Sequence, residues 1–310
     1  MSAKGACMML VISLAPGAAP SLCRAEGPPP RVGAWDDPTA TGDGPWEATL
    51  EGRVGFPVGR LKVGEFPTGA NKAGGGGTPG TLLHFHTLGI DHSEVIDAST
   101  AFHFTPRDAV RAGFLYYFLD GSTKISGPSV VYNGQEFTNG SLDTNSDFYR
   151  LSLDYERTLF GRPWQHELIG TIGLTYVNLN LKLTGATKSG GGAESRGQSN
   201  SEDFYRQELP VPILGLRWTY PLSNRWFLRT SLSGGGLPRV DSGRTEGGTV
   251  FLHQAHADLG LAVVYRISGL AHVEAGYHLS YLFQKESSHE DKNVFELFDN
   301  GLRVQLGIRF

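Results

Sequence analysis

The end of the chain constrains its fold more than any other stretch. Counting back from the last residue, every second side chain is apolar, and polar or glycine residues stand between them. The apolar members are Leu302, Val304, Leu306, Ile308 and Phe310. Because successive side chains of a strand point to opposite faces, this segment predicts a strand with one apolar and one polar face. Chain ends of soluble domains tend to be polar and frayed, so an apolar face that reaches the last residue favours another environment.

This terminal segment resembles that of the bacterial outer-membrane β-barrel proteins. In that class a terminal Phe, preceded by alternating apolar residues, is the signal recognised by the barrel-assembly machinery. The resemblance implies an antiparallel transmembrane β-barrel in the outer membrane of a Gram-negative cell. It also implies contact with outer-membrane lipid and lipopolysaccharide, and a monomer as the default state. It specifies the class of protein and no particular activity.

The composition agrees with a barrel and argues against membrane helices. The chain has 310 residues, of which 39% are hydrophobic and 42 are glycines, but no stretch approaches the ~20 apolar residues that a membrane-spanning helix needs. The hydrophobicity is spread in alternation, which is the weaker signal that transmembrane barrels give.

The first 25 residues have the features of a secretory signal. Lys4 gives a positive start, residues 7–14 form a short apolar core, and cleavage is expected after Ala25. A lipoprotein that uses Cys23 is the weaker alternative, because Leu22 stands where a small residue is needed. Both cysteines lie in this segment, so the mature chain would contain no disulfide. Cleavage leaves 25 basic residues against 31 acids, about −6, which argues against nucleic acid as a partner.

The mature chain divides into a short arm and a long alternating region. Residues 26–45 are rich in Pro, Gly and Asp and predict a flexible periplasmic segment. Residues 46–310 predict the barrel. We count ten strands, with 8–12 possible, at residues 46–56, 96–104, 110–118, 149–156, 166–183, 214–220, 226–232, 255–267, 273–283 and 294–310.

Short and long connections alternate along the chain, as expected for short periplasmic turns and long extracellular loops. The segment 105–108 (TPRD) is one short turn, because Pro presets φ and Asp can bond the following backbone. We expect long polar loops at residues 120–146, 184–203, 233–248 and 284–293. Residues 57–95 predict one long hairpin whose tip protrudes, or alternatively two extra strands. A change of apolar phase near Tyr176 and Val177 indicates a bulge.

Aromatic side chains cluster near the short-turn ends of the predicted strands, where they would form an interfacial girdle. They are Trp46, Phe104, Tyr155, Trp164, Tyr220, Trp226 and Phe310. The alternative fold is a soluble β-sandwich, but sandwich strands are usually ~3–10 residues long and that fold leaves the terminal signature unexplained.

The polar faces of the strands would line the lumen, and they carry eight acids and eight arginines. The set is Glu47, Glu51, Arg53, Asp97, Arg111, Arg150, Asp154, Glu156, Glu167, Arg217, Arg229, Asp258, Arg266, Glu274, Arg303 and Arg309. A barrel of about eight strands is just wide enough for side chains to fill it, and ten strands add little room. Opposite charges confined there should pair, since an unpaired buried charge is costly. The sequence therefore favours a plugged lumen and a structural or surface-exposed role, with a narrow, porin-like channel as the alternative.

An enzyme at the extracellular rim is the third alternative. Ten-stranded barrels include surface proteases of the omptin family, which use paired Asp and an Asp-His pair, and smaller barrels include lipid A deacylases with a His-Ser-Glu set. This chain has DHSE at 91–94 and HED at 289–291 in predicted loop regions. Adjacent residues of an extended strand point to opposite faces, so His92 and Ser93 are poorly placed to act as base and nucleophile. No catalytic residue is assigned.

Histidines are the only candidate metal ligands. His84 and His86 share a face of a strand and would bind a metal only with a third ligand. The lumen is the expected location of His103, His256, His272 and His278. The run 74–77 is glycine-rich, but the Lys-Ser/Thr of a phosphate-binding loop does not follow it. We therefore expect no cofactor and no metal.

Overall fold

The computed structural model describes residues 44–64, 80–188, 194–206, 209–245, 249–288 and 292–310. The predicted signal peptide at 1–25 and nearly all of the predicted arm at 26–45 lie outside these ranges. The helices of the described ranges are too short or too polar to cross a membrane.

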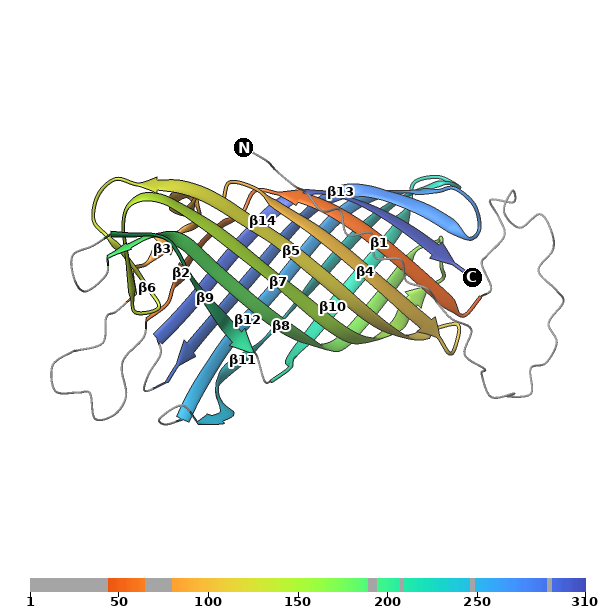
Figure 1. The fold of residues 1–310 in the computed structure, drawn as a ribbon. Helices are drawn as coiled ribbons and strands as arrows, with labels where there is room; N and C mark the ends of the chain where they lie inside the picture. The colour runs from red at the N-terminus through yellow and green to blue at the C-terminus, as the bar shows by residue number, and fades with distance from the viewer. Residues whose placement is uncertain (1–43, 65–79, 189–193, 207–208, 246–248, 289–291) are drawn as a thin grey trace, which may run out of the picture. The chain divides into compact units, whose positions relative to one another are not determined.

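Ten strands form a closed ring in which every neighbouring pair is antiparallel (Figure 1). In chain order these strands are β1 (Trp46–Gly55), β4 (Ser93–His103), β5 (Asp108–Ile125), β7 (Gln135–Gly161), β8 (Glu167–Lys188), β10 (Val211–Pro221), β11 (Trp226–Thr245), β12 (Thr249–Arg266), β13 (Ala271–Ser287) and β14 (Lys292–Arg309). The prediction of about ten antiparallel strands is confirmed.

The ring closes between its first and last strands. β1 pairs with β14 in an unbroken register from Glu47 opposite Arg309 to Gly55 opposite Gly301. The N–H of Trp46 donates to the carbonyl of Phe310 at 3.0 Å, and the N–H of Phe310 donates to the carbonyl of Trp46 at 2.8 Å. Closure leaves the ring without a free edge, and a barrel in lipid needs this because unpaired backbone groups are costly there.

The two ends of the barrel differ. Turns within residues 104–108, 161–167, 221–226 and 266–271 lie at one end, together with Trp46 and Phe310; we call it the short-turn end. Strands at the opposite, long-loop end run much farther than predicted. β5 continues to Ile125, β7 begins at Gln135, and β11 continues to Thr245. Much of each predicted long loop is therefore hydrogen-bonded strand.

Alternation of the strands places large apolar side chains on the outside of the short-turn half of the barrel. This apolar belt includes Leu50, Val54, Ile96, Val110, Phe114, Leu151, Leu153, Ile172, Leu174, Leu214, Leu216, Leu232, Leu259, Leu261, Val263, Leu302, Val304 and Leu306, all exposed. A continuous outward apolar band is what the hydrocarbon interior of a membrane requires of a barrel.

Farther along the strands the two faces exchange polarity. On β8, Ile172 and Leu174 are exposed, whereas Val177 and Leu179 are buried inside the barrel and Lys182 points outward. The bulge predicted near Tyr176 and Val177 was wrong, because β8 pairs with β7 without a register shift through this region. The phase of the apolar residues changes because the strand leaves the belt, so that its outer face becomes polar and its inner face becomes apolar.

Shorter elements occupy the long-loop end: β2 (Val58–Lys62), β3 (Leu83–His84), the 3₁₀ helix η2 (Phe85–Leu88), β6 (Val130–Tyr132) and β9 (Glu194–Arg206). After a break at Phe56 and Pro57, β2 continues along β14 and pairs with β3. The predicted hairpin at 57–95 thus contains two extra short strands outside the ring, and its tip at 65–79 lies outside the described residues.

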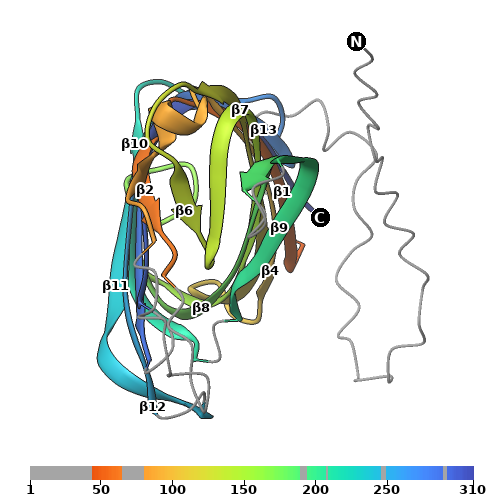
Figure 2. The same cartoon turned by 60° about the vertical axis from the view of Figure 1, so that its left-hand side comes forward.

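These elements bring an apolar core into the long-loop half of the lumen. Figure 2 shows β2 and β6 within the outline of the ring. The core comprises Leu61, Val63, Leu83, Phe85, Leu88, Ile90, Val95, Leu115, Tyr117, Leu119, Tyr132, Phe137, Leu142, Phe148, Val177, Leu179, Leu181, Leu183, Leu282, Phe295 and Leu297. Each of these side chains is at most 5% exposed. The sequence did not predict an apolar interior.

Candidate functional site: the barrel lumen

The strands turn all sixteen predicted charged side chains away from the lipid-facing surface, and none of them is exposed. Twelve form ion pairs with one another: Glu47, Glu51, Arg53, Asp97, Arg111, Arg150, Glu156, Arg217, Arg229, Asp258, Glu274 and Arg303. We call this set the lumen charge network.

Glu51 lies at the middle of the lumen charge network. It pairs with Arg53 of its own strand and with Arg303 of β14, whose Nη1 lies 2.7 Å from Oε2 of Glu51. Arg303 also reaches Glu274 of β13 at 3.2 Å, and Glu274 pairs with Arg229 of β11. Each of these charges therefore meets an opposite charge from another strand, as an interior of low dielectric requires.

A branch of the network crosses the barrel from β1 to β7. The guanidinium of Arg53 lies 3.0 Å from Asp97 and 3.0 Å from Nε2 of His278. His278 lies 3.3 Å from Asp258, which accepts a hydrogen bond from Arg150 at 2.9 Å. His278, expected to face the lumen, thus joins charges that are not neighbours in the ring.

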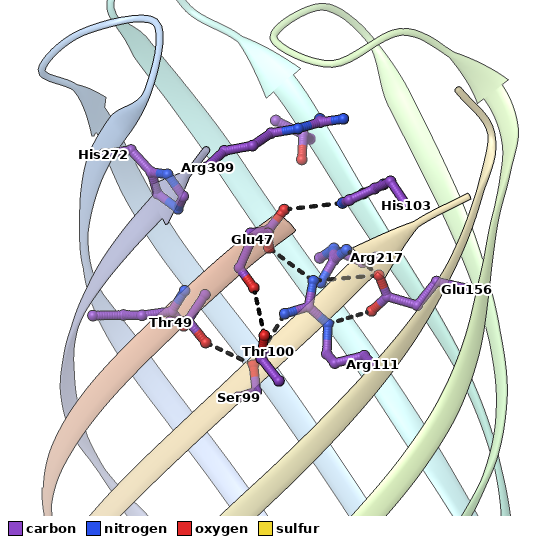
Figure 3. A network of polar contacts seen from close by, with 12 residues as sticks. Glu47, Thr49, Ser99, Thr100, His103, Arg111, Glu156, Arg217, His272 and Arg309 are labelled. Carbon is purple, nitrogen blue, oxygen red and sulfur yellow. Dashed lines mark hydrogen bonds and ion pairs between the residues drawn. The ribbon is translucent and has the colours of Figure 1, made fainter. Parts of the chain in front are cut away.

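A second cluster lies nearer the short-turn end and is shown in Figure 3. Arg111 of β5 lies 2.8 Å from Glu156 of β7 and 2.8 Å from Glu47 of β1. Arg217 of β10 reaches the other oxygen of Glu156 at 3.0 Å, and His103 lies 3.6 Å from Glu47. Carboxylates and guanidinium groups alternate, so the charges are neutralised locally.

The remaining four predicted residues lie at the margins of the network. Arg309 donates to the carbonyl of Gly44 at 3.2 Å, and Arg266 donates to the carbonyl of Asn224 at 2.7 Å. Glu167 is buried on β8, and Asp154 lines a cavity.

Trp164 points inward at the short-turn end, where it lines a cavity of about 800 Å³. Its φ of 59° lies in the left-handed region that non-glycine residues seldom adopt. The indole packs at 5.2 Å from the rings of both Phe227 and His272, which are buried, and the guanidinium of Arg266 lies 5.6 Å from it. Trp164 was predicted in the interfacial girdle; instead it turns inward, because the turn between β7 and β8 folds toward the barrel axis.

A polar cavity of about 200 Å³ lies beside the lumen charge network. Arg150, Asp154 and Glu156 line one side of it, and Ser231 and Ser233 are among the small residues that line it elsewhere. Small side chains on β8, β10 and β11 thus leave space that the charged side chains do not fill.

A polar strip continues from this cavity toward the long-loop end along β12 and β13. Gln254 and Gln284 face each other across the ladder and are at most 1% exposed, and His256 is also buried. Among the described residues, no partner bonds the side-chain oxygen or nitrogen of either glutamine, or Nε2 of His256. Buried polar atoms in this state are typical of sites that hold water.

The candidate catalytic and metal-binding residues that the structure describes are not assembled into a site. Ser93 is fully buried, and its hydroxyl donates to Asp299 at 2.9 Å, whereas the neighbouring His92 is exposed. The rings of His84 and His86 lie 5.6 Å apart. Within the described ranges no three or more His, Cys, Asp or Glu residues are grouped to hold a metal ion. Residues 289–291 lie outside those ranges.

No protein-family model matches the sequence, and no curated protein does. The structure is similar to the outer membrane protease OmpT from Escherichia coli, with 12% identity, 87% of this chain and 98% of that chain covered, and a TM-score of 0.48. It is similar to the translocator domain of the autotransporter NalP from Neisseria meningitidis, with 15% identity, 86% and 89% covered, and a TM-score of 0.42. The toluene transporter TodX of P. putida shares 11% identity, with 89% and 92% covered and a TM-score of 0.34.

The closed ring and the apolar belt decide the architecture on their own. The fold is that of a bacterial outer-membrane β-barrel. A sandwich would leave sheet edges and would bury its apolar faces between two sheets, whereas this barrel exposes an apolar face around its whole ring.

Proposed function

We propose that this outer-membrane barrel has a structural or surface-exposed role and that its lumen is closed. The observation that carries the proposal is the apolar core in the long-loop half. Protein interiors pack about as densely as organic crystals, and an ion in such a core loses its hydration without gaining a partner. The core is anchored by Phe85 and Leu88 of η2, which are 1% exposed.

Two further closures lie in series with the core. The lumen charge network spans the belt region, where every cation on a transit path would meet paired guanidinium groups and every anion paired carboxylates. Trp164, with Phe227 and His272, partly obstructs the short-turn end, where it lines one side of a cavity of about 800 Å³. An open pore would need to be continuous through all three layers.

The orientation follows from the connections. Short turns of outer-membrane barrels lie in the periplasm and long loops outside the cell, so the long-loop end is extracellular. Beyond the belt the strands present polar side chains outward, among them Asp120, Asp143, Asn180 and Lys182. This water-facing extension is the part available for a surface role.

The proposal includes the biogenesis and partners expected from the sequence. Residues 1–25 direct export and are removed, residues 26–45 remain as a periplasmic segment, and the assembly machinery recognises the strand that ends at Phe310. The apolar belt contacts outer-membrane lipid and lipopolysaccharide, and the barrel is a monomer.

Single-channel recording in a planar bilayer tests the closed lumen. We expect purified wild-type protein to give no reproducible current steps in molar salt, while its faster migration without boiling on a detergent gel shows that the barrel is folded. Reproducible steps from folded wild-type protein would overturn the proposal.

A narrow polar path is the second candidate, favoured by the cavity beside Asp154 and by the strip of Gln254, His256 and Gln284. If this path conducts, wild-type protein gives small steps, and a variant with Gln254→Leu and Gln284→Leu gives none. The matched control is Asn180→Leu, which changes an exposed amide on the outer wall beyond the belt. Steps that persist in the double variant would place conduction elsewhere.

A further inference from the structure

The outer wall of the barrel carries a basic pocket near the extracellular end of β12 and β13. The described residues that line it include Arg239, His253, Lys285 and Lys292 and no acid, and the pocket has a volume of about 480 Å³. All four basic side chains are exposed. The hydroxyl residues Thr249, Ser287 and Ser288 complete the lining.

Aromatic rings pack against two of these basic side chains. The guanidinium of Arg239 lies 4.2 Å from the ring centroid of Phe251, and the ring of His253 lies 5.3 Å from that of Phe283. Among the described residues, the acid nearest in sequence to Arg239 is Asp241, which accepts a hydrogen bond from the backbone N–H of Gly243 at 2.9 Å. The pocket therefore presents a positioned set of donors of the kind that binds phosphate.

A shallow apolar trough that is open to the surroundings lies on the same lipid-facing wall, toward the short-turn end. Its lining includes Leu214, Leu232, Gly234 and Ala257. Gly234 lies opposite Ala257 in the ladder, so two small residues meet at the upper end of the trough. Ala257 and His253 share one face of β12 four residues apart, about 13 Å along the strand.

The pocket and the trough are thus in line, with cations at the extracellular edge of the belt and a depression in the belt beneath them. We propose that this wall binds one phosphorylated, acylated lipid of the outer leaflet. Arg239, His253 and Lys285 bind its phosphate, and an acyl chain lies in the trough beside Gly234 and Ala257. The inference rests on the outer-membrane orientation proposed above and is independent of whether the lumen is closed.

Native mass spectrometry of the full chain in detergent tests the site. Lipid A is the probe; its dephosphorylated form and inorganic phosphate are the comparisons. We expect Arg239→Gln with Lys285→Gln to lower the lipid-bound fraction at least tenfold. Lys124→Gln with Lys182→Gln, which removes two exposed cations elsewhere on the wall, is the matched control and should leave binding unchanged. Ala257→Leu should lower binding severalfold, and Ala98→Leu on the lipid-facing side of β4 should not.

Three results would overturn the proposal. These are undiminished binding by the Arg239 and Lys285 double variant, equal binding of the dephosphorylated lipid, and displacement of lipid A by millimolar phosphate, which would mark a site for the free ion. Each variant is first shown to be folded by its heat-modifiable migration. Because conductance is recorded separately, a conducting lumen would contradict the proposed function without affecting this result.

Discussion

Nη1 of Arg303 lies 2.7 Å from Oε2 of Glu51, so the last strand is joined to the first inside the lumen as well as through the backbone ladder. Both side chains are buried. The contact links the closing seam of the ring to the lumen charge network, and stability of the barrel is therefore expected to depend on it.

Arg303→Met should destabilise the folded barrel by about 3–5 kcal/mol, because it leaves the carboxylates of Glu51 and Glu274 buried with one fewer cation. Urea unfolding of protein refolded in lipid vesicles measures the change. The matched control is Arg157→Met. Arg157 is exposed and lies 3.5 Å from Asp108, so its removal should lower the free energy of unfolding by less than ~1 kcal/mol. If the two variants lose the same free energy of unfolding, the burial of the Arg303 ion pairs does not increase their contribution to stability.

Phe85→Ala should destabilise the long-loop half by about 3–5 kcal/mol, the usual cost of removing a buried phenyl group. Phe85 is 1% exposed, and its ring lies 5.8 Å from that of Phe295 on β14. Its neighbour His86 is exposed on the same 3₁₀ helix, and His86→Ala is the control expected to change little. Protease digestion of the folded barrels measures the difference, and equal resistance of the two variants would argue against a packed core.

Phe310→Ser should lower the amount of protein in the outer membrane while barely changing the stability of barrels refolded in detergent. The side chain is 59% exposed, and the hydrogen bonds of Phe310 to Trp46 use backbone atoms, which the substitution keeps. Leu222→Ser, at an exposed apolar position in a short turn, is the control for lost hydrophobicity. If the Phe310 variant reaches normal levels in the outer membrane, the Phe310 side chain is not needed for assembly.

Acid should weaken the turn between β4 and β5. Hydrogen bonds from the hydroxyls of Thr105 and Tyr155, each 2.6 Å long, hold the pKa of Asp108 below its usual value, with smaller help from Arg157. A depressed pKa in the folded state contributes stability that is present above the unfolded value of about 3.9 and is lost as pH falls through the folded value. Urea unfolding from pH 6 to pH 2 should show this loss in the wild type.

Asp108→Asn is the variant that isolates the effect. It removes the titrating group but keeps a side chain of the same size, so its stability should fall less than that of the wild type over the same pH range. Parallel pH profiles for the two proteins would show that Asp108 does not contribute.

The outward faces and the positions of the lumen charges could be predicted because each is a local property. Lipid demands an apolar side chain at every outward position, so Val110 and Phe114 reveal their strand directly, and the alternate positions such as Arg111 must then face the lumen. The same rule fails beyond the belt. Beyond the belt, water surrounds the barrel and the apolar core fills its inside. Val177 and Leu179 also alternate with other residues, but their apolar side chains point inward.

Other features could not be predicted because they depend on side chains distant in sequence. Trp164 was predicted to lie in the girdle because it follows a strand end. The sequence does not show whether the turn that carries it folds outward or inward. Phe85 and Leu88 are only a few apolar residues in a polar stretch, and their burial becomes apparent once β2 and β3 are seen to fold into the mouth of the ring.

By itself, the sequence determined a barrel of about ten antiparallel strands, the pairing of the Phe310 strand with the Trp46 strand, and which side chains of the belt face outward. These follow from an alternation that every strand carries locally and from the cost of leaving backbone groups unpaired in lipid. Only the tertiary structure decided that Arg303 pairs with Glu51 and Glu274 and that an apolar core occupies the long-loop half of the lumen. Those contacts depend on the stagger and width of the closed ring, which no single strand encodes.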